Sequence, residues 1–375
     1  MQCSMVAGEA SSDLLGSLLL RAMKARWPQL HACGIGGSHM VAEGFDAWWS
    51  SRELAVRGYV EVLRHYPRIS GIRRQLTQRL LDQPPRMFIG VDAPDFNLGL
   101  EARLKAKGIP TVHFVCPSVW AWRGGRIKTL AESTDLVLCL FPFEAPLLQR
   151  AGVRAQYVGH PLADVIAMHP DRQAARVALG LASNHTVVCL MPGSRRSEIS
   201  HIAPTMLRAA AVLAKQHPGL RFVLPCVPGL REVVARWLES NPVPGLQLLD
   251  GQSHTALAAC DLTLIASGTA TLEAALFKRP MVIVYRMNAL TWQLMKRMAY
   301  QPWVGLPNIL CREFVVPELI QEQFTVSALV QEANAWLADP QRSQVLQERF
   351  EALHVSLRHN TAQSATDAIQ TQISA

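Results

Sequence analysis

The segment GVDAPDFN at residues 90–97 holds the side chains best suited to acid–base chemistry. It follows an apolar run at residues 87–89, which predicts a strand buried on both faces. Asp92, Asp95 and Asn97 come directly after that strand, at the position where ligands bind in open parallel sheets. A carboxylate there suits a general base, whereas the alternative is that these residues cap the following helix.

The segment MPGSRRSEI at residues 191–199 has the composition of a phosphate-binding loop. Gly193 and Ser194 let backbone N–H groups at a helix start approach an anion, and Arg195 adds a guanidinium. The segment is neither a Walker A sequence nor a G-x-G-x-x-G fingerprint. The alternative interpretation is a surface arginine after a tight turn.

A second loop of this kind is SGTATLEAAL at residues 267–276. Ser267, Gly268 and Thr269 form a small polar turn before an expected helix, and Glu273 lies one helical turn further on. Two anion-binding helix starts in one half of the chain favour a nucleotide diphosphate, with Glu273 suited to the two hydroxyls of a ribose. Alternatively, Ser267 or Thr269 is simply a helix N-cap.

The order of strand and helix patterns predicts a doubly wound parallel α/β fold that occurs twice. In the first half, expected strands lie at residues 3–7, 32–35, 87–91, 111–116, 136–141 and 156–158. The pattern restarts with expected strands at residues 187–191, 221–225, 247–249, 262–266 and 281–285. We therefore expect two Rossmann-like domains facing each other across a cleft, at residues 1–160 and 161–340. The helices of residues 341–375 are expected to pack on the first domain or on a partner subunit.

Composition excludes several classes of protein. Of the 375 residues, 49% are hydrophobic and 18% charged, which is typical of a globular protein and not of a disordered one. The eight cysteines are scattered without a C-x-x-C motif, so we expect a reducing cytoplasm. No apolar run approaches the roughly 18 residues that cross a membrane, and the start lacks the pattern of a signal peptide.

The net charge of +8 is concentrated in residues 52–79, which combine arginines with apolar side chains. The arginines are Arg52, Arg57, Arg64, Arg68, Arg73, Arg74 and Arg79. Such a surface suits an anionic membrane, and no helix-turn-helix, zinc-finger or RNP pattern favours nucleic acid. A solvated helix face is the alternative. A second apolar set at helical spacing, facing either a membrane or a core, is Met287, Leu290, Leu294, Met295 and Met298.

Taken in order, the motifs resemble those of the lipid-A-disaccharide synthase family. They are GEASSD, GVDAPDFN, PSVWAW, GHPLAD, PGSRRSEI, ASGTATLEAAL, YRM and LPNIL, and they span nearly the whole chain. The resemblance implies an inverting glycosyltransferase of the GT-B fold, with the acceptor bound by the first domain and the UDP-sugar by the second. This family transfers 2,3-diacylglucosamine from UDP-2,3-diacylglucosamine to 2,3-diacylglucosamine 1-phosphate, forming the β-1,6-linked lipid A disaccharide and UDP.

The resemblance also implies roles for individual residues. Asp92 and Arg195 resemble the family's essential aspartate and arginine, and Glu9 competes with Asp92 for the role of base. The residues implied in UDP binding are Gly193, Ser194, Arg195, Ser267, Gly268, Thr269, Glu273 and Asn308. Those implied on the acceptor side, in the loop at residues 7–13, are Glu9, Ser11 and Asp13. Ser12 stands where the family has glycine, so we expect this loop to be narrower.

No Asp-x-Asp motif occurs in the chain, so we expect no metal and no other cofactor. Arg195 and the helix starts would then stabilise the departing diphosphate. The expected partners are the two lipid substrates and the inner leaflet of the inner membrane, not nucleic acid, and a homodimer stays open. The enzyme would thus lie in the cytoplasm, peripheral to that membrane. Two rivals remain: a UDP-N-acetylglucosamine epimerase and a nucleotide-binding module without catalysis.

Overall fold

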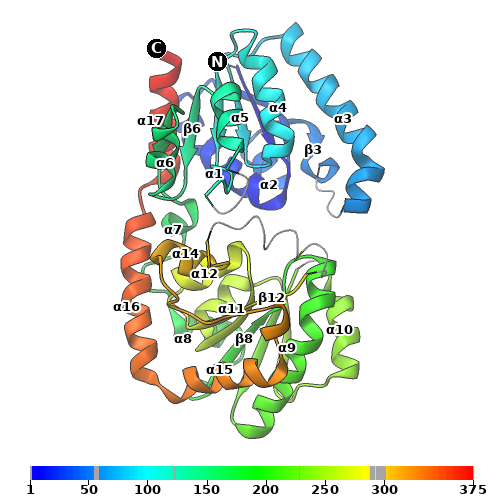
Figure 1. The fold of residues 1–375 in the computed structure, drawn as a ribbon, viewed down its shortest axis with the longest axis vertical. Helices are drawn as coiled ribbons and strands as arrows, with labels where there is room; N and C mark the ends of the chain where they lie inside the picture. The colour runs from blue at the N-terminus through cyan, green and yellow to red at the C-terminus, as the bar shows by residue number, and fades with distance from the viewer. Residues whose placement is uncertain are drawn as a thin grey trace. The chain divides into compact units, whose positions relative to one another are not determined.

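The computed structural model describes residues 2–54, 59–120, 124–227, 229–287, 292 and 301–374, and at residues 10, 59–66 and 374 this covers the backbone only. Contacts divide the chain into two compact units (Figure 1). The first comprises Met1–Asp164 and Ser356–Ala375, and the second comprises Val165–Val355. The chain passes from one unit to the other within α7 (Pro161–Val165) and again within α16 (Pro340–Leu357). Most of α16 therefore belongs to the second unit.

The first unit is built on a seven-stranded parallel sheet in the order β3-β2-β1-β4-β5-β6-β7. Its strands are β1 (Gln2–Ala7), β2 (His31–Gly36), β3 (Asp46–Ser50), β4 (Met87–Val91), β5 (Thr111–Phe114), β6 (Leu136–Cys139) and β7 (Ala155–Tyr157). The six strands expected in this half are confirmed, while β3 was missed. Its sequence, DAWWS, has no apolar run because this edge strand is only partly buried.

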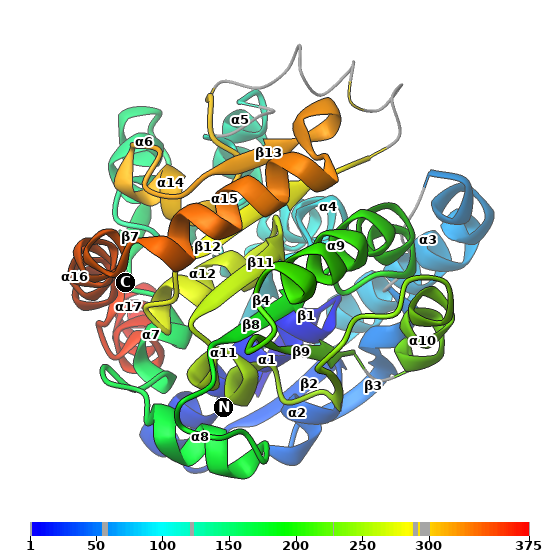
Figure 2. The ribbon, with the colours of Figure 1, turned by 90° about the horizontal axis from the view of Figure 1, so that it is seen from below.

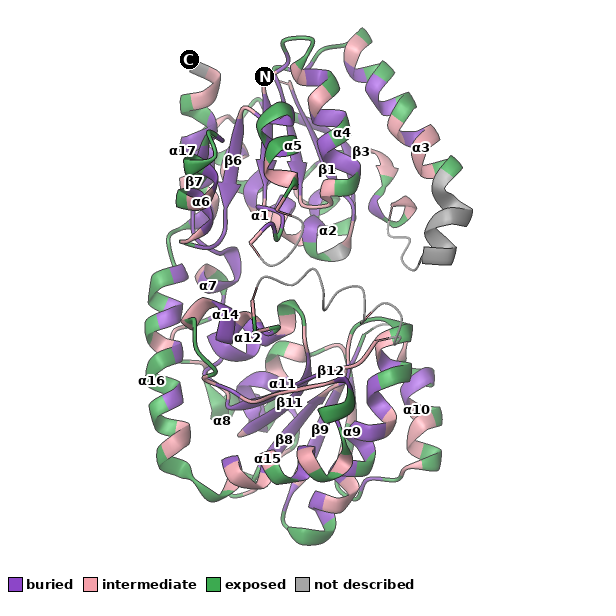
Figure 3. Ribbon diagram, viewed as in Figure 1, coloured by how far each residue is buried: buried purple, intermediate pink, exposed green. Residues whose placement is uncertain are grey.

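Helices cover both faces of this sheet, which is why its central strands are buried throughout (Figure 3). Leu19 of α1 (Ala10–Arg26) and Ile369 of α17 (Thr361–Ser374) share one core cluster with the sheet. Leu76 of α3 (Tyr59–Asp82) and Leu100 of α4 (Pro94–Lys105) belong to another. The remaining helices of this unit are α2 (Ser38–Ala42), α5 (Arg126–Ser133) and α6 (Glu144–Arg150).

The second unit has a six-stranded parallel sheet in the order β10-β9-β8-β11-β12-β13. Its strands are β8 (Val187–Met191), β9 (Arg221–Cys226), β10 (Leu246–Asp250), β11 (Leu262–Ala266), β12 (Met281–Tyr285) and β13 (Glu318–Ile320). The five strands expected in this half are confirmed. The sequence analysis missed β13, a strand of three half-buried residues at the edge of the sheet. Both sheets thus reverse their order at the first strand of the unit, and that reversal is where α/β sheets bind ligands.

The helices of the second unit lie on both sides of its sheet (Figure 2). They are α8 (Arg172–Ala178), α9 (Arg196–Gln216), α10 (Arg231–Ser240), α11 (Ser253–Ala259), α12 (Thr269–Leu276), α14 (Leu306–Cys311), α15 (Val326–Ala338) and most of α16. β8 and β11 each end in a loop that starts a helix, α9 and α12, so these two loops hold helix N-termini at one edge of the sheet. Within the described residues, no helix has both the length and the apolar character needed to cross a bilayer.

Candidate active site

The loop after β4 has an uncommon backbone. Asp92 and Ala93 both have positive φ angles, 53° and 46°, which side-chain-bearing residues rarely adopt. The Asp92 N–H donates to Phe114 O at 2.8 Å, and the Asp92 carbonyl accepts from Asn97 Nδ2 at 2.7 Å. Asn97 Nδ2 also donates to Val6 O of β1 at 3.3 Å. The buried Asn97 side chain therefore fixes the turn that presents Asp92, as a structural residue of this loop.

The carboxyl group of Asp92 lies in a partly buried, weakly hydrated position. Burial raises its pKa above the ordinary value, and this effect is opposed by the charge of His113 and by a hydrogen bond with the Ala93 backbone. A base whose pKa is raised from that of a free carboxyl towards the working pH accepts a proton more readily in the transition state. The neighbouring Asp95 is different, because its side chain is exposed and forms an ion pair with Arg126.

The first loop lies beside the Asp92 loop, because β1 pairs with β4 and Ala7 is the register partner of Val91. A Cβ added to Gly8 would lie 3.1 Å from the Cβ of Ala93, so the two loops are in contact. Glu9 is the N-cap residue of α1, and its N–H donates to Ser12 Oγ at 2.9 Å. The structure therefore brings together Glu9 and Asp92, the two candidates for the base.

Asp13 has a different environment from the one expected of a substrate-binding residue. Its buried carboxylate accepts three backbone N–H groups at the start of α2, from Gly37 at 2.7 Å, His39 at 2.9 Å and Met40 at 3.1 Å. Ser11, by contrast, is exposed in the first turn of α1. The contacts of Asp13 are those of a structural residue that joins α1 to α2.

In the second unit, the loops after β8 and β11 lie side by side, because Ile265 pairs with Met191. Gly193 has a φ of 125°, a region favoured by glycine, and Arg195 is the N-cap residue of α9. Gly268, with a φ of 155°, precedes α12 in the same way, and a Cβ added there would meet open space. Two helix N-termini with glycine-rich approaches thus share one sheet edge.

The sequence analysis missed Glu198, which occupies the first of these helix starts. Its Oε2 accepts the Ser194 N–H at 3.0 Å, and its Oε1 pairs with Arg195 Nη1 at 2.6 Å. The spacing of Arg195 and Glu198, three residues apart on one helix turn, was a signal that could have indicated this ion pair. A carboxylate of the chain itself therefore binds the donors that were expected to hold a phosphate.

Two more of the expected UDP-binding residues have partners within the chain. Glu273 Oε2 lies 3.0 Å from Nε2 of His254, a residue that the sequence analysis also missed. The Ser267 hydroxyl donates to Val304 O at 3.2 Å, and Thr269 is exposed at the start of α12. Ser267 and Thr269 lie in or next to the loop after β11, and Glu273 lies about one helical turn further along α12.

Asn308 is buried and takes part in a structural network. Its amide donates to Val316 O at 2.9 Å and to Glu318 Oε1 at 2.8 Å, and its oxygen accepts the Val316 N–H at 3.0 Å. Glu318 Oε1 also accepts the Gly305 N–H at 2.8 Å. In this arrangement Asn308 and Glu318 hold the segment between α14 and β13. Glu318 Oε2 also accepts the N–H of Val304 at 2.9 Å, and the Val304 carbonyl is the partner of Ser267.

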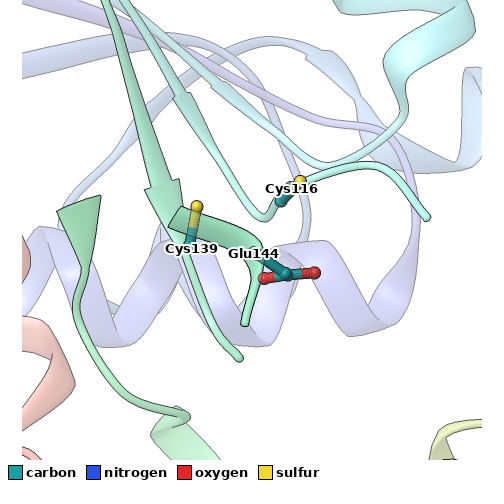
Figure 4. Close-up of side chains that lie close together, drawn as sticks. All are labelled: Cys116, Cys139 and Glu144. Carbon is teal, nitrogen blue, oxygen red and sulfur yellow. The ribbon is translucent and has the colours of Figure 1, made fainter. Parts of the chain in front are cut away.

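Among the described residues, one cluster has three metal-ligand side chains close together: Cys116, Cys139 and Glu144 (Figure 4). Both carboxylate oxygens of Glu144 have hydrogen bonds, from Trp120 Nε1 at 2.9 Å and from the Leu140 and Phe141 N–H groups at 3.1 and 3.0 Å. The cluster offers three donor groups, one fewer than a structural zinc site takes. Its contacts are accounted for by the packing of the loop that follows β6.

Comparison with known proteins places this chain in a family. The sequence model described as lipid-A-disaccharide synthetase matches residues 3–370. The chain belongs to that family. The lipid-A-disaccharide synthase of Albidiferax ferrireducens is 55% identical over 376 residues, covering 99% of this chain and 97% of the relative. That of Paraburkholderia xenovorans is 51% identical over 375 residues, covering 100% and 96%.

Solved structures share the fold at low sequence identity. The glycosyltransferase of kitacinnamycin has a TM-score of 0.66 at 17% identity, covering 99% of this chain and 98% of that one. The UDP-GlcNAc 2-epimerase of Neisseria meningitidis, bound to UDP-GlcNAc, has a TM-score of 0.62 at 12% identity, covering 100% and 99%. The expected GT-B fold class is thereby confirmed. Because the sequence relatives are synthases, the epimerase resembles this chain in fold alone.

Family membership also confirms the expected activity. The chain is an inverting hexosyltransferase of lipid A biosynthesis, which transfers 2,3-diacylglucosamine from UDP-2,3-diacylglucosamine to 2,3-diacylglucosamine 1-phosphate. The bond formed is a β-1,6 glycosidic bond, and the leaving group is UDP.

Proposed function

We propose that Asp92 is the general base of this transfer. The acceptor hydroxyl attacks the anomeric carbon, the bond from that carbon to the UDP phosphate breaks, and the hydroxyl proton passes to Asp92. The proposal is supported by the position of Asp92 at the reversal point of the first sheet and by the burial that raises its pKa. Glu9, at the start of α1 beside this loop, is the competing candidate.

In the same proposal, the second unit binds UDP at the starts of α9 and α12. Arg195 and the N–H groups after Gly193 and Gly268 stabilise the negative charge of the departing diphosphate. Glu273, with His254 as its partner, binds the ribose hydroxyls. A UDP ligand is supported by the shared fold of the epimerase that was solved with UDP-GlcNAc. Of the other implied residues, Asn308 and Asp13 act by holding their loops.

The base is tested by comparing Asp92→Asn with Asp95→Asn, which makes the same chemical change three residues further on, in the first turn of α4. We expect Asp92→Asn to lower kcat by about 10²–10⁴-fold with UDP affinity unchanged, and Asp95→Asn to remain near the parent enzyme. Arg195→Ala should weaken UDP binding as well as turnover. The measurements are UDP release with both lipid substrates and UDP binding by calorimetry. Near-normal turnover of Asp92→Asn would exclude Asp92 as the base. Glu9 would then be tested as the base with the variant Glu9→Gln.

We also propose that the enzyme binds the anionic inner leaflet through the arginines of residues 52–79. In the described part, Arg52, Arg68, Arg74 and Arg79 are exposed. Arg68 forms an ion pair with Glu53, and Arg79 stacks over Trp48 at 3.7 Å from the ring centroid. Arg57 and the side chain of Arg64 lie outside the described residues. Two apolar side chains of this segment, Leu54 and Ile69, pack against a core cluster and are therefore not available to a membrane. Charge therefore supports this proposal more than apolar area does.

The second apolar set is mostly outside the described residues, namely Leu290, Leu294, Met295 and Met298. Membrane attachment is tested by sedimentation with vesicles of neutral lipid and vesicles that also hold anionic lipid. We expect binding to anionic vesicles that falls with salt and with the substitution of Arg52 and Arg74 by Ala. Binding that does not depend on anionic lipid would contradict the proposal. A homodimer stays an open alternative, to be measured by sedimentation equilibrium.

A further inference from the structure

A buried histidine–glutamate pair lies close to the strand that leads to Asp92 in the first unit. His113 of β5 and Glu101 of α4 both have fully buried side chains, and His113 Nδ1 lies 2.8 Å from Glu101 Oε1. His113 is the register partner of Gly90 on β4, two residues before Asp92. A Cβ added to Gly90 would lie 2.1 Å from Glu101 Oε1, so glycine is needed here to make room for the pair. The strands β4 and β5 and the helix α4 are thus in close contact at Gly90.

The pair is costly to bury and is incompletely bonded. Within the described part of the chain, His113 Nε2 and Glu101 Oε2 have no hydrogen-bond partner, and neither has Asn97 Oδ1. A buried ion pair is commonly no more stabilising than apolar residues of similar volume. The position of the pair suggests a function other than stability. Against the effect of burial, the pKa of His113 is raised by the charge of Glu101, on α4, and by the charge of Asp92, in the loop after β4.

We propose that Glu101 and His113 are positioning residues for Asp92, with Glu101 keeping His113 charged and His113 holding the Asp92 carboxylate ionised. The inference rests on the proposed role of Asp92 as base. No proton passes through the pair: the proton of the acceptor hydroxyl goes to Asp92 and leaves from there to solvent. Burial alone raises the pKa of Asp92, and the charge of His113 opposes that rise. Asp92 is thereby kept in the form that accepts a proton.

The test is the pH profile of kcat in Glu101→Gln and His113→Gln. Without the charge of His113, the pKa of Asp92 rises, so the acid limb of the profile should move up by about one pH unit or more. At a fixed pH on the acid limb, kcat should fall roughly tenfold for each unit of that shift, and it should recover to the parent value as the pH rises, with UDP affinity unchanged. A purely structural defect would not recover at higher pH.

Thr111→Val is the matched control, because it removes a buried hydrogen bond at the other end of the same strand. It should lower stability without moving the acid limb. Glu101→Gln and His113→Gln profiles that superimpose on the parent profile, with Asp92→Asn inactive, would overturn this inference alone. An active Asp92→Asn would overturn the proposed base instead. If the variants do not fold, ¹⁵N chemical shifts of His113 in the parent enzyme decide: a neutral imidazole at the working pH overturns the inference.

Discussion

Asp13 is either a structural residue of the first unit or a substrate-binding residue, and the variant Asp13→Asn distinguishes the two roles. The carboxylate accepts three backbone N–H groups, from Gly37, His39 and Met40, and is 2% exposed. An asparagine keeps one oxygen but turns an NH₂ group toward at least one of those donors. Each hydrogen bond to a charged acceptor contributes about 1.5–3 kcal/mol, so the loss of one bond and of the charge should cost about 2–4 kcal/mol.

For a domain of this size, each kcal/mol shifts Tm by about 2–4 °C, so the first unit should unfold roughly 5–15 °C lower. Scanning calorimetry measures that shift, and initial rates over a range of acceptor concentrations measure KM. The folded fraction of Asp13→Asn should keep the parent KM for the acceptor. Ser11→Ala, an exposed change in the same turn, is the control and should leave Tm unchanged. An unchanged Tm of Asp13→Asn together with a raised acceptor KM would refute the structural interpretation.

Three further predictions concern buried charge, the UDP site and metals. Burial raises the pKa of Glu144 from 4.5 to about 8, so the stability that its neutral form contributes is full below pH 4.5 and is lost as the pH rises through 8. The unfolding free energy of the parent, relative to Glu144→Gln, should therefore fall by about 1.4 kcal/mol per pH unit across that interval in denaturant titrations, and a constant difference would contradict it. Because Glu198 binds the Ser194 N–H and Arg195, Glu198→Gln should bind UDP roughly tenfold more tightly by calorimetry, a gain of about 1.4 kcal/mol. Weaker binding would mean that Glu198 positions Arg195. UDP release should survive treatment with EDTA, and a loss of activity that Mg²⁺ restores would show a metal requirement.

The sequence by itself determined the fold class and the places where chemistry is possible. Buried parallel strands need apolar runs, and these runs placed the central strands of both sheets within a few residues. Polar loops that follow such strands are local features, so the segments after β1, β4, β8 and β11 were recognised as candidate sites. The edge strand β3 was missed because only Trp48 and Trp49 in DAWWS are even partly buried, and β13 was missed because it has only three half-buried residues.

The tertiary structure decided which partners each polar residue has. Asp13 and the N–H groups of α2 are more than twenty residues apart along the chain, and His113 comes twelve residues after Glu101 on a different element. Glu198, by contrast, is near Arg195 in sequence, yet its hydrogen bond with the Ser194 N–H is decided by the folded loop. A motif specifies which side chains are present. Burial and the partners contributed by other elements set the pKa of those side chains and decide whether their polar groups are already bound within the chain. For Asp92, the two effects that act most on its pKa are burial and the charge of His113 on β5, and both arise from the fold.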